Sequence, residues 1–327
     1  MADHAIPLVK QRGAGPVIWL GLAALVLLAM LSLGIGVATL VPGSERGWLL
    51  LTISRIPRTL AAMLTGAALA VSGVVMQQVV RNRFVEPGSV GTTESAALGL
   101  LAVTLLAPTA PIWAKMAAAA LAALAGTALF ARIIRNLPPR EPLLVPLAGL
   151  MLAAILGAVV TFIAWETDLM QFVAIWLMSG EFSGVIAGRY ELLWIAGAAA
   201  LLAWFAADRF AILALGAEAA TTLGLDAAAV LRLGLGVVAL VAAMVVVSVG
   251  MVPFVGLVVP NIVARLMGDN LRATLPVVAL FGAVLVLACD IIGRLLIYPY
   301  EIPAGAVLGV VGAAVFLWLL WQRPGRG

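Results

Sequence analysis

Three arginine residues stand at the ends of long apolar runs, where their charge could bind an acidic group. Arg55 and Arg58 precede the apolar run 59–80, and Arg294 lies near the end of the run 274–297. Because Arg55 and Arg58 are three residues apart, they share one face if a helix begins there. A guanidinium group can bind a carboxylate through two parallel hydrogen bonds, so the pattern predicts a basic rim that receives an acidic partner. The alternative is that all three arginines are anchors whose charged ends reach water.

Acidic residues accompany the third of these arginines. Asp290 and Arg294 are four residues apart and would pair on one helix face, and Glu301 follows the same run. An acid inside an apolar run is a candidate functional group, and a structural ion pair is the alternative interpretation.

The residues that ordinary enzyme catalysis needs are nearly missing from the sequence. His4 is the single histidine and Cys289 the single cysteine, so we expect no histidine-based catalytic site, no metal site and no internal disulfide. The sequence also lacks a G-x-x-x-x-G-K-[ST] phosphate-binding loop. We therefore expect a protein that is not an enzyme and holds no cofactor, so that any ATP hydrolysis belongs to a partner.

The composition is that of a membrane protein. Of the 327 residues, 64% are hydrophobic and 10% are charged, whereas about one quarter of a soluble domain is charged. Because about 20 apolar residues can cross a bilayer as a helix, the sequence predicts an all-α polytopic membrane protein with about ten transmembrane helices. The net charge of +4 is assigned to loop arginines and not to nucleic-acid binding. The expected spans are 17–41, 59–80, 90–107, 112–134, 142–165, 190–206, 229–250, 255–267, 274–297 and 304–322.

Basic residues predict how these spans are oriented. With the N-terminus in the cytoplasm, thirteen of the lysines and arginines fall on the cytoplasmic side and six on the outer side. We therefore expect a cytoplasmic N-terminal tail over 1–16, a single transmembrane domain over 17–322 and a cytoplasmic C-terminal tail over 323–327. The segment 169–183 is expected to be an interfacial helix on the outer side.

Four further patterns lie within the domain. The cytoplasmic segment 216–226 is short and amphipathic, and it either closes a loop or docks onto a partner. Pro253 and Pro260 interrupt the run 252–270, and broken helices in membranes tend to line cavities or gates. Gly66, Ala70 and Gly73 are spaced for close helix packing, as are Gly305 and Gly309. The span 59–80 also contains polar residues that a helix facing only lipid would not need, and they are candidates for lining a passage: Thr65, Ser72, Gln77 and Gln78.

From about 49 to 321 the chain resembles the permease subunits of FecCD-type ABC importers, which take up iron–siderophore complexes, haem and cobalamin. The resemblance rests on RIPRTLAAMLTGAALAVSG at 55–73, PLAGLML at 146–152, FVGLVVPNIVARL at 254–266 and EIPAGAVLGVVGAAVFLWLL at 301–320. It implies a type II ABC importer architecture in a bacterial cytoplasmic (inner) membrane. The implied partners are two ATP-binding subunits, a periplasmic or lipid-anchored substrate-binding protein, and a second permease, either a second copy or a paralogue.

The resemblance also assigns roles to individual residues. Arg55, Arg58 and Arg294 match arginines that receive acidic residues of the binding protein. A gate or passage is implied at Pro142 and Leu143, where cobalamin importers have small hydroxyl residues, and at Pro260 and Asn261. Coupling to the ATPase is implied for Ala217, Glu218, Leu223, Gly224, Leu225 and Asp226.

A finer resemblance concerns the substrate. Asn261, MGDN at 267–270 and CDIIGRLLIYPYEI at 289–302 are similar to the branch that imports ferric catecholate siderophores. Cobalamin or haem is the alternative substrate within the same family. Two other classes are a secondary carrier that works without ATP and a purely structural membrane scaffold, for which an arginine rim and broken helices would have no purpose.

Overall fold

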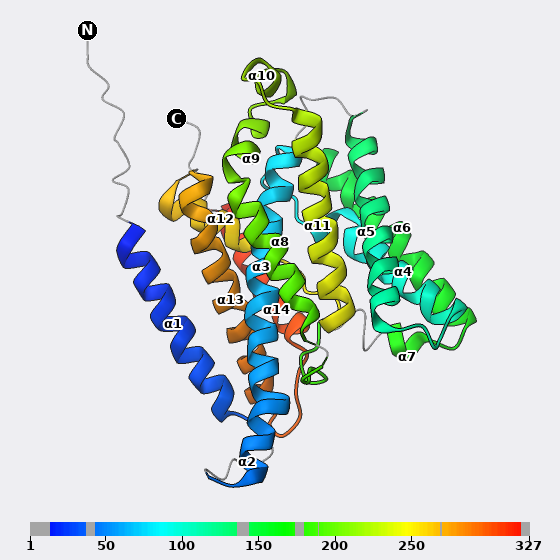
Figure 1. Ribbon diagram of the computed structural model, residues 1–327, viewed down its shortest axis with the longest axis vertical. Helices are drawn as coiled ribbons and strands as arrows, with labels where there is room; N and C mark the ends of the chain where they lie inside the picture. The colour runs from blue at the N-terminus through cyan, green and yellow to red at the C-terminus, as the bar shows by residue number, and fades with distance from the viewer. Residues whose placement is uncertain are drawn as a thin grey trace.

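The computed structural model describes residues 14–36, 43–135, 144–173, 180–188, 190–268 and 270–321. Over these residues the chain is a bundle of helices joined by short connections (Figure 1). Pro142 and Leu143 lie outside the described residues, as do most of the two terminal tails. The helices are α1 (Ala14–Gly34), α2 (Glu45–Leu50), α3 (Ile56–Val80), α4 (Thr92–Leu106), α5 (Ile112–Arg135), α6 (Leu144–Glu166), α7 (Met170–Phe172), α8 (Leu192–Phe205), α9 (Ala207–Ala214), α10 (Ala217–Thr222), α11 (Ala227–Val249), α12 (Val255–Met267), α13 (Leu271–Leu296) and α14 (Ala304–Trp321), with a π-helical turn η1 (Leu51–Arg55) and a 3₁₀ turn η2 (Pro87–Val90).

The predicted number of spans agrees with the structure. In the described part of the chain, six helices are long and apolar enough to cross a bilayer. The pair α8 and α9, bent by 64° at Ala206, forms a seventh candidate, and three shorter apolar helices, α4, α12 and α14, bring the total to ten. The second span is longer than expected, because α2, η1 and α3 run continuously over Glu45–Val80. The prediction of about ten spans in an all-α fold is therefore confirmed.

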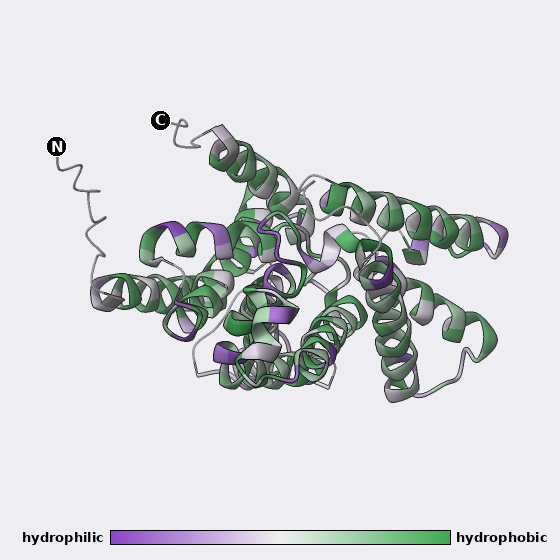
Figure 2. Ribbon diagram, turned by 90° about the horizontal axis from the view of Figure 1, so that it is seen from above, coloured by the Kyte–Doolittle hydropathy of each residue, from purple (hydrophilic) through white to green (hydrophobic). Residues whose placement is uncertain are grey.

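The bundle has two polar ends and an apolar girdle between them. The start of α1, the end of α14 and α10 lie at one end, called the α10 end here, whereas α2 and α7 lie at the opposite, α2 end (Figure 1). The helices between these ends consist mostly of hydrophobic residues (Figure 2). Exposed tryptophans occur near both ends, as they do in proteins whose aromatic rings sit at the two membrane interfaces. They are Trp48, Trp113, Trp165 and Trp194 near the α2 end and Trp19, Trp318 and Trp321 near the α10 end.

Helix α3 is the centre of the bundle, and glycines let its neighbours approach it closely. It contacts α8, α11, α12 and α13. A methyl group added at Gly66 would lie 2.1 Å from the carbonyl oxygen of Gly282 in α13, and one at Gly73 would lie 2.0 Å from the carbonyl oxygen of Gly256 in α12. The backbones therefore touch at both places, and the close packing predicted from this small-residue spacing is confirmed.

Helix α12 is short because the chain before it is not helical. Helix α11 ends at Gly250, with a φ of 83°, and Phe254 enters α12 with a φ of 66°. The interruption predicted from Pro253 lies in this connection. Pro260, by contrast, lies inside α12 and does not divide it.

The segment 169–183 is helical only in part among its described residues. The helix α7 covers Met170–Phe172, and the chain from Gly180 onward is irregular, with a φ of 59° at Gly180. The backbone N–H of Gly305 donates to the carbonyl of Gly180, so this loop holds the start of α14. A methyl group at Gly180 would lie 2.9 Å from the α-carbon of Gly305. No described residue lies within 4 Å of a methyl group at Gly309, so the close packing predicted there is not found.

The close approach of α3 and α12 can be tested by adding one methyl group. Replacing Gly73 with Ala should destabilise the protein by about 1–3 kcal/mol, because the new carbon meets backbone that cannot rotate away. Gly236→Ala in α11 is the matched control, since nothing lies within 4 Å of that position. The measurement is unfolding by sodium dodecyl sulfate in mixed micelles. Equal stability of the two variants would contradict the packing described here.

Candidate functional site

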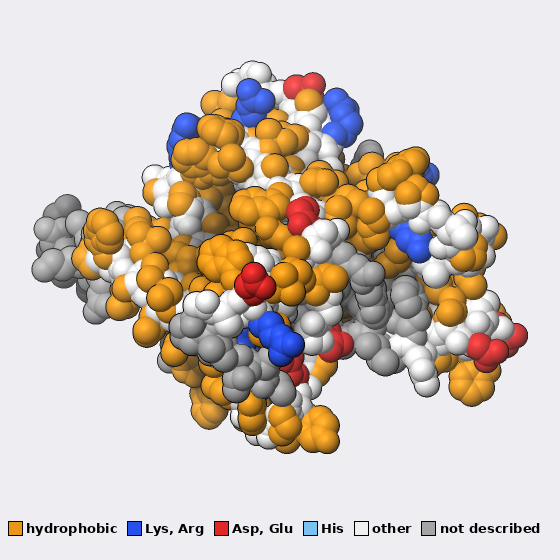
Figure 3. Space-filling view, turned by 60° about the horizontal axis from the view of Figure 1, so that its bottom comes forward, with side chains coloured by type: hydrophobic (Ala, Val, Ile, Leu, Met, Phe, Trp, Pro, Cys, Tyr) orange, Lys and Arg blue, Asp and Glu red, His pale blue; other side chains and the backbone are white. Residues whose placement is uncertain are grey.

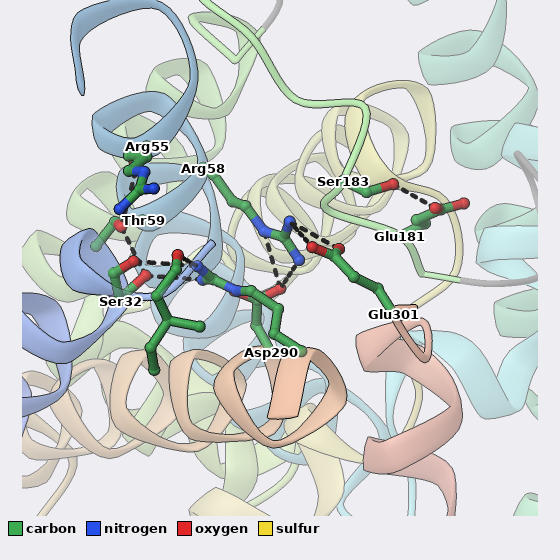
Figure 4. A network of polar contacts seen from close by, with 10 residues as sticks. Ser32, Arg55, Arg58, Thr59, Glu181, Ser183, Asp290 and Glu301 are labelled. Atoms are coloured by element: carbon green, nitrogen blue, oxygen red, sulfur yellow. Dashed lines mark hydrogen bonds and ion pairs between the residues drawn. The ribbon is translucent and has the colours of Figure 1, made fainter. Parts of the chain in front are cut away.

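The α2 end contains a network of charged side chains centred on Asp290. The carboxylate of Asp290, in α13, lies between the guanidinium groups of Arg58 and Arg294 (Figure 4). Arg58 donates to Asp290 Oδ1 from Nε at 3.2 Å and from Nη2 at 2.7 Å, and Arg294 pairs with Oδ2. The side chains of Asp290 and Arg294 are only 2% and 4% exposed. The structural ion pair that the four-residue spacing suggested is therefore present.

A second set of hydrogen bonds ties α1 to this network. Arg294 donates to the carbonyl oxygen of Ser32 at 3.1 Å and to its hydroxyl at 2.7 Å. The Ser32 hydroxyl also shares a hydrogen bond of 2.8 Å with Thr59, whose hydroxyl donates to the carbonyl of Arg55. The Arg55 side chain turns toward the end of α1, where it donates to the carbonyls of Leu33 and Gly34 at 2.7 and 3.0 Å. Side chains from α1, η1, α3 and α13 thus hold α1 against α3 and α13.

The three predicted rim arginines are thus at one end of the bundle, but each has partners within the chain. Arg55 and Arg294 are buried, and only Arg58, at 12% side-chain exposure, reaches toward water, where it pairs with Glu301. Acidic and basic side chains gather among hydrophobic ones on this end of the molecule (Figure 3). A docking role for these arginines stays a prediction, and Arg58 is the one placed to meet a partner directly.

The predicted coupling segment forms the tip of the α10 end (Figure 1). Its helix α10 covers Ala217–Thr222, and Ala217, Glu218 and Gly224 are exposed. Leu223 follows the helix with 64% of its surface exposed, whereas Leu225 packs partly against the core. The carboxylate of Asp226 accepts a hydrogen bond from the Ala229 N–H at 2.9 Å and so caps the start of α11. An exposed leucine directly after a short, protruding helix is suited to docking, and this role stays a prediction.

Glu86 is a buried acid that the sequence analysis did not single out. Its carboxylate accepts a hydrogen bond of 3.0 Å from the N–H of Phe254, at the start of α12. Helix α12 has no capping side chain of its own, because Phe254 stands where an aspartate, asparagine or serine usually caps. Glu86 supplies that acceptor from a distant part of the chain. The one signal in the sequence was the apolar Phe254 at the start of α12, since a helix that begins with an apolar residue needs its capping acceptor from elsewhere in the chain.

Asn261 fastens α12 to the same connection. Its side-chain amide donates to the carbonyl of Arg83 at 2.9 Å and to that of Leu257 at 2.7 Å. Gln77 also reaches α12, since its amide donates to the Gly256 carbonyl at 3.3 Å. The connection after α3 therefore holds α12 at its start and along its length. Pro260, next to Asn261, is buried in α12.

The residues proposed to line a passage lie at different depths in the bundle. Thr65 and Ser72 are fully buried in α3, where their hydroxyl groups have no hydrogen-bond partner among the described residues. Gln77 is buried against α12. Gln78 is partly exposed. A lining role for these four residues stays a prediction, and for Thr65 and Ser72 it would require the helices around α3 to separate.

Comparison with known proteins bears on what this arrangement does. The model of the FecCD transport family matches residues 17–322. The chain belongs to the FecCD transport family. That match covers all of the spans, from α1 to α14, and so includes the Asp290 network, α10 and the capped start of α12.

Two relatives and one solved structure are similar to this FecCD chain over most of its length. The petrobactin import system permease protein YclN of Bacillus subtilis is 41% identical over 304 residues, which cover 91% of this chain and 96% of YclN. The ferric-anguibactin transport system permease protein FatD of Vibrio anguillarum is 40% identical, covering 85% of this chain and 88% of FatD. A metal-chelate type ABC transporter in an inward-facing conformation superposes with a TM-score of 0.80 at 25% identity, covering 95% of this chain and all of that one.

The buried ion network should contribute strongly to stability. Replacing Asp290 with Ala leaves the buried Arg294 without a counter-charge and Arg58 with Glu301 alone, and breaking a buried pair in this way typically costs about 3–5 kcal/mol. Asp208→Ala is the control, because Asp208 also pairs with an arginine, Arg272, but both side chains are 59% exposed. That loss should stay within about 1 kcal/mol. Similar losses in the two variants, measured by unfolding in mixed micelles, would contradict a special role for Asp290.

Glu86 should make stability depend on pH. Burial raises the pKa of Glu86 from 4.5 to about 7, although hydrogen bonds from the N–H groups of Phe254, Leu257 and Gly256 oppose this rise. The folded protein then keeps a proton that the unfolded chain releases, so stability should fall as the pH rises from about 5 to 7. Glu86→Gln keeps an oxygen acceptor for the Phe254 N–H but has no proton to lose. Its unfolding midpoint should therefore vary less over this pH range, and an unchanged slope would contradict the assignment.

Proposed function

We propose that this chain is the permease subunit of a binding-protein-dependent ABC importer that moves a ferric siderophore, of the catecholate type, across a bacterial cytoplasmic (inner) membrane. The observation that carries the proposal is the 41% identity to a petrobactin permease, which extends over 96% of that relative. The similarity to a ferric-anguibactin permease supports the same class of cargo. The siderophore would be a transported substrate, and the chain would have no catalytic role of its own.

The two ends of the bundle suit two different partners. We place the α10 end, with both termini, in the cytoplasm, because most of the lysines and arginines lie on that side. An ATP-binding subunit would dock on α10 and the exposed Leu223 that follows it. The α2 end would then face outward, where Arg58 would meet an acidic substrate-binding protein.

A complete transporter would contain two such permeases and two ATP-binding subunits. The passage would then be lined by groups that bind the cargo weakly. Weak binding suits transport, since a tightly held siderophore would not be released to the cytoplasm. Selection of the cargo would fall mainly to the binding protein.

The proposed function can be tested by uptake into proteoliposomes that hold this chain with its ATP-binding subunit. Candidate binding proteins are added one at a time, and the one that supports uptake is used. Uptake of ferric petrobactin labelled with iron-55 is then compared with uptake of cobalamin and of haem, with and without internal ATP. Uptake of iron that needs both ATP and the binding protein would support the proposal. Uptake of cobalamin or haem instead would keep the mechanism and exclude the siderophore.

A coupling variant separates this mechanism from that of a secondary carrier. Leu223→Asp should weaken docking of the ATP-binding subunit about tenfold and reduce uptake accordingly, because it places a charge in an apolar contact. Leu106→Asp, at the end of α4, is the control for the substitution itself, because Leu106 is even more exposed than Leu223. Transport that proceeds without ATP and is indifferent to Leu223→Asp would exclude an ABC importer.

A further inference from the structure

The guanidinium group of Arg58 has one buried partner and one exposed partner. Its Nε and Nη2 atoms donate to Asp290, whose side chain is 2% exposed. Its Nη1 atom lies 3.1 Å from Oε1 and 2.8 Å from Oε2 of Glu301, whose side chain is 28% exposed. The two carboxylates approach different edges of the same guanidinium (Figure 4). Arg58 is thus a bridge between the interior of the bundle and its outer surface.

The network is neutral only when Glu301 is included. The two positive charges of Arg58 and Arg294 face the two negative charges of Asp290 and Glu301. If Glu301 turned away into water, the remaining three groups would have a net charge of +1. A carboxylate from another protein could then take its place and restore neutrality. The Glu301 side of Arg58 is the more exposed one, since the Glu301 side chain is 28% exposed and that of Asp290 only 2%.

We propose that Glu301 is an internal stand-in for the carboxylate of the binding protein, so that docking exchanges one Arg58 ion pair for another. This inference rests on the proposed function, since it needs an acidic partner at the α2 end. The pair with Glu301 is the one that gives way, because an ion pair open to water is weak. The pair between Arg58 and Asp290 stays, because separating buried charges is costly.

The chain around Glu301 allows this exchange by side-chain rotation alone. The next residue, Ile302, donates its N–H to the carbonyl of Gly293, and Gly305 donates to Gly180. These backbone hydrogen bonds fix the connection between α13 and α14 on the C-terminal side of Glu301. The carboxylate can therefore leave Arg58 without moving the start of α14. Each docking event must displace Glu301 first, so the stand-in lowers the affinity and favours release of the binding protein.

The exchange predicts that removing the charge of Glu301 tightens docking. The permease complex is placed in nanodiscs, and its affinity for the binding protein that supports uptake is measured by biolayer interferometry. Glu301→Gln should bind severalfold more tightly, up to about fivefold, which is the range expected when a competing exposed ion pair is lost. Its association rate should also fall more steeply with added salt, because Arg58 is no longer neutralised. Glu166→Gln, an exposed acid at the end of α6 on the same side, should leave the affinity unchanged.

The outcomes separate this inference from the proposed docking itself. If wild-type docking weakens in salt but Glu301→Gln binds no more tightly, the exchange is wrong and electrostatic docking stands. If wild-type docking does not respond to salt, the docking proposal is wrong. If Glu166→Gln tightens binding as much as Glu301→Gln, the effect is one of general charge, and the exchange is wrong. Should Glu301→Gln fail to fold, Glu301→Asp withdraws the carboxylate by one methylene, and its binding must also tighten for the exchange to hold.

Discussion

The close approach of α3 to its neighbours is the constraint on which the rest of the bundle depends. Without side chains at Gly66 and Gly73, the backbone of α3 touches that of α13 near one glycine and that of α12 near the other. Because a bilayer offers little hydrophobic driving force between helices, such contacts and buried polar bonds must hold the bundle together. The same approach brings Arg58 of α3 within reach of Asp290 on α13. The buried ion network is therefore a consequence of how closely these helices pack.

The polar contacts at the two ends of α3 are of different kinds. At the α2 end, the network joins α1, α3 and α13 and leaves the Arg58–Glu301 pair facing water. At the opposite end, the connection after α3 returns to hold α12 through Glu86 and Asn261. A partner that pulled on Arg58 would thus act on a helix whose far end is fixed to α12. Helix α3 thus joins the buried ion network to the start of α12.

Much of this structure could be predicted from the sequence, and the exceptions have physical reasons. Apolar length placed all ten spans, and the spacing of Gly66 and Gly73 indicated a close contact, because both are properties of local sequence. The four-residue spacing of Asp290 and Arg294 likewise predicted a pair within one helix. The link between Arg58 and Glu301, and the cap that Glu86 provides for α12, join residues more than 160 positions apart. Neither link follows from periodicity, since each depends on which helices become neighbours.

If the chain is the permease proposed above, docking of a binding protein at the α2 end should stimulate an ATP-binding subunit at the α10 end. The most direct test is the rate of ATP hydrolysis by the reconstituted complex, with the ATP-binding subunits accessible and the binding protein added at the opposite face. The account predicts that loaded binding protein raises the rate, and that Leu223→Asp removes the increase while Leu106→Asp does not. A hydrolysis rate that ignores the binding protein at every salt concentration would contradict it.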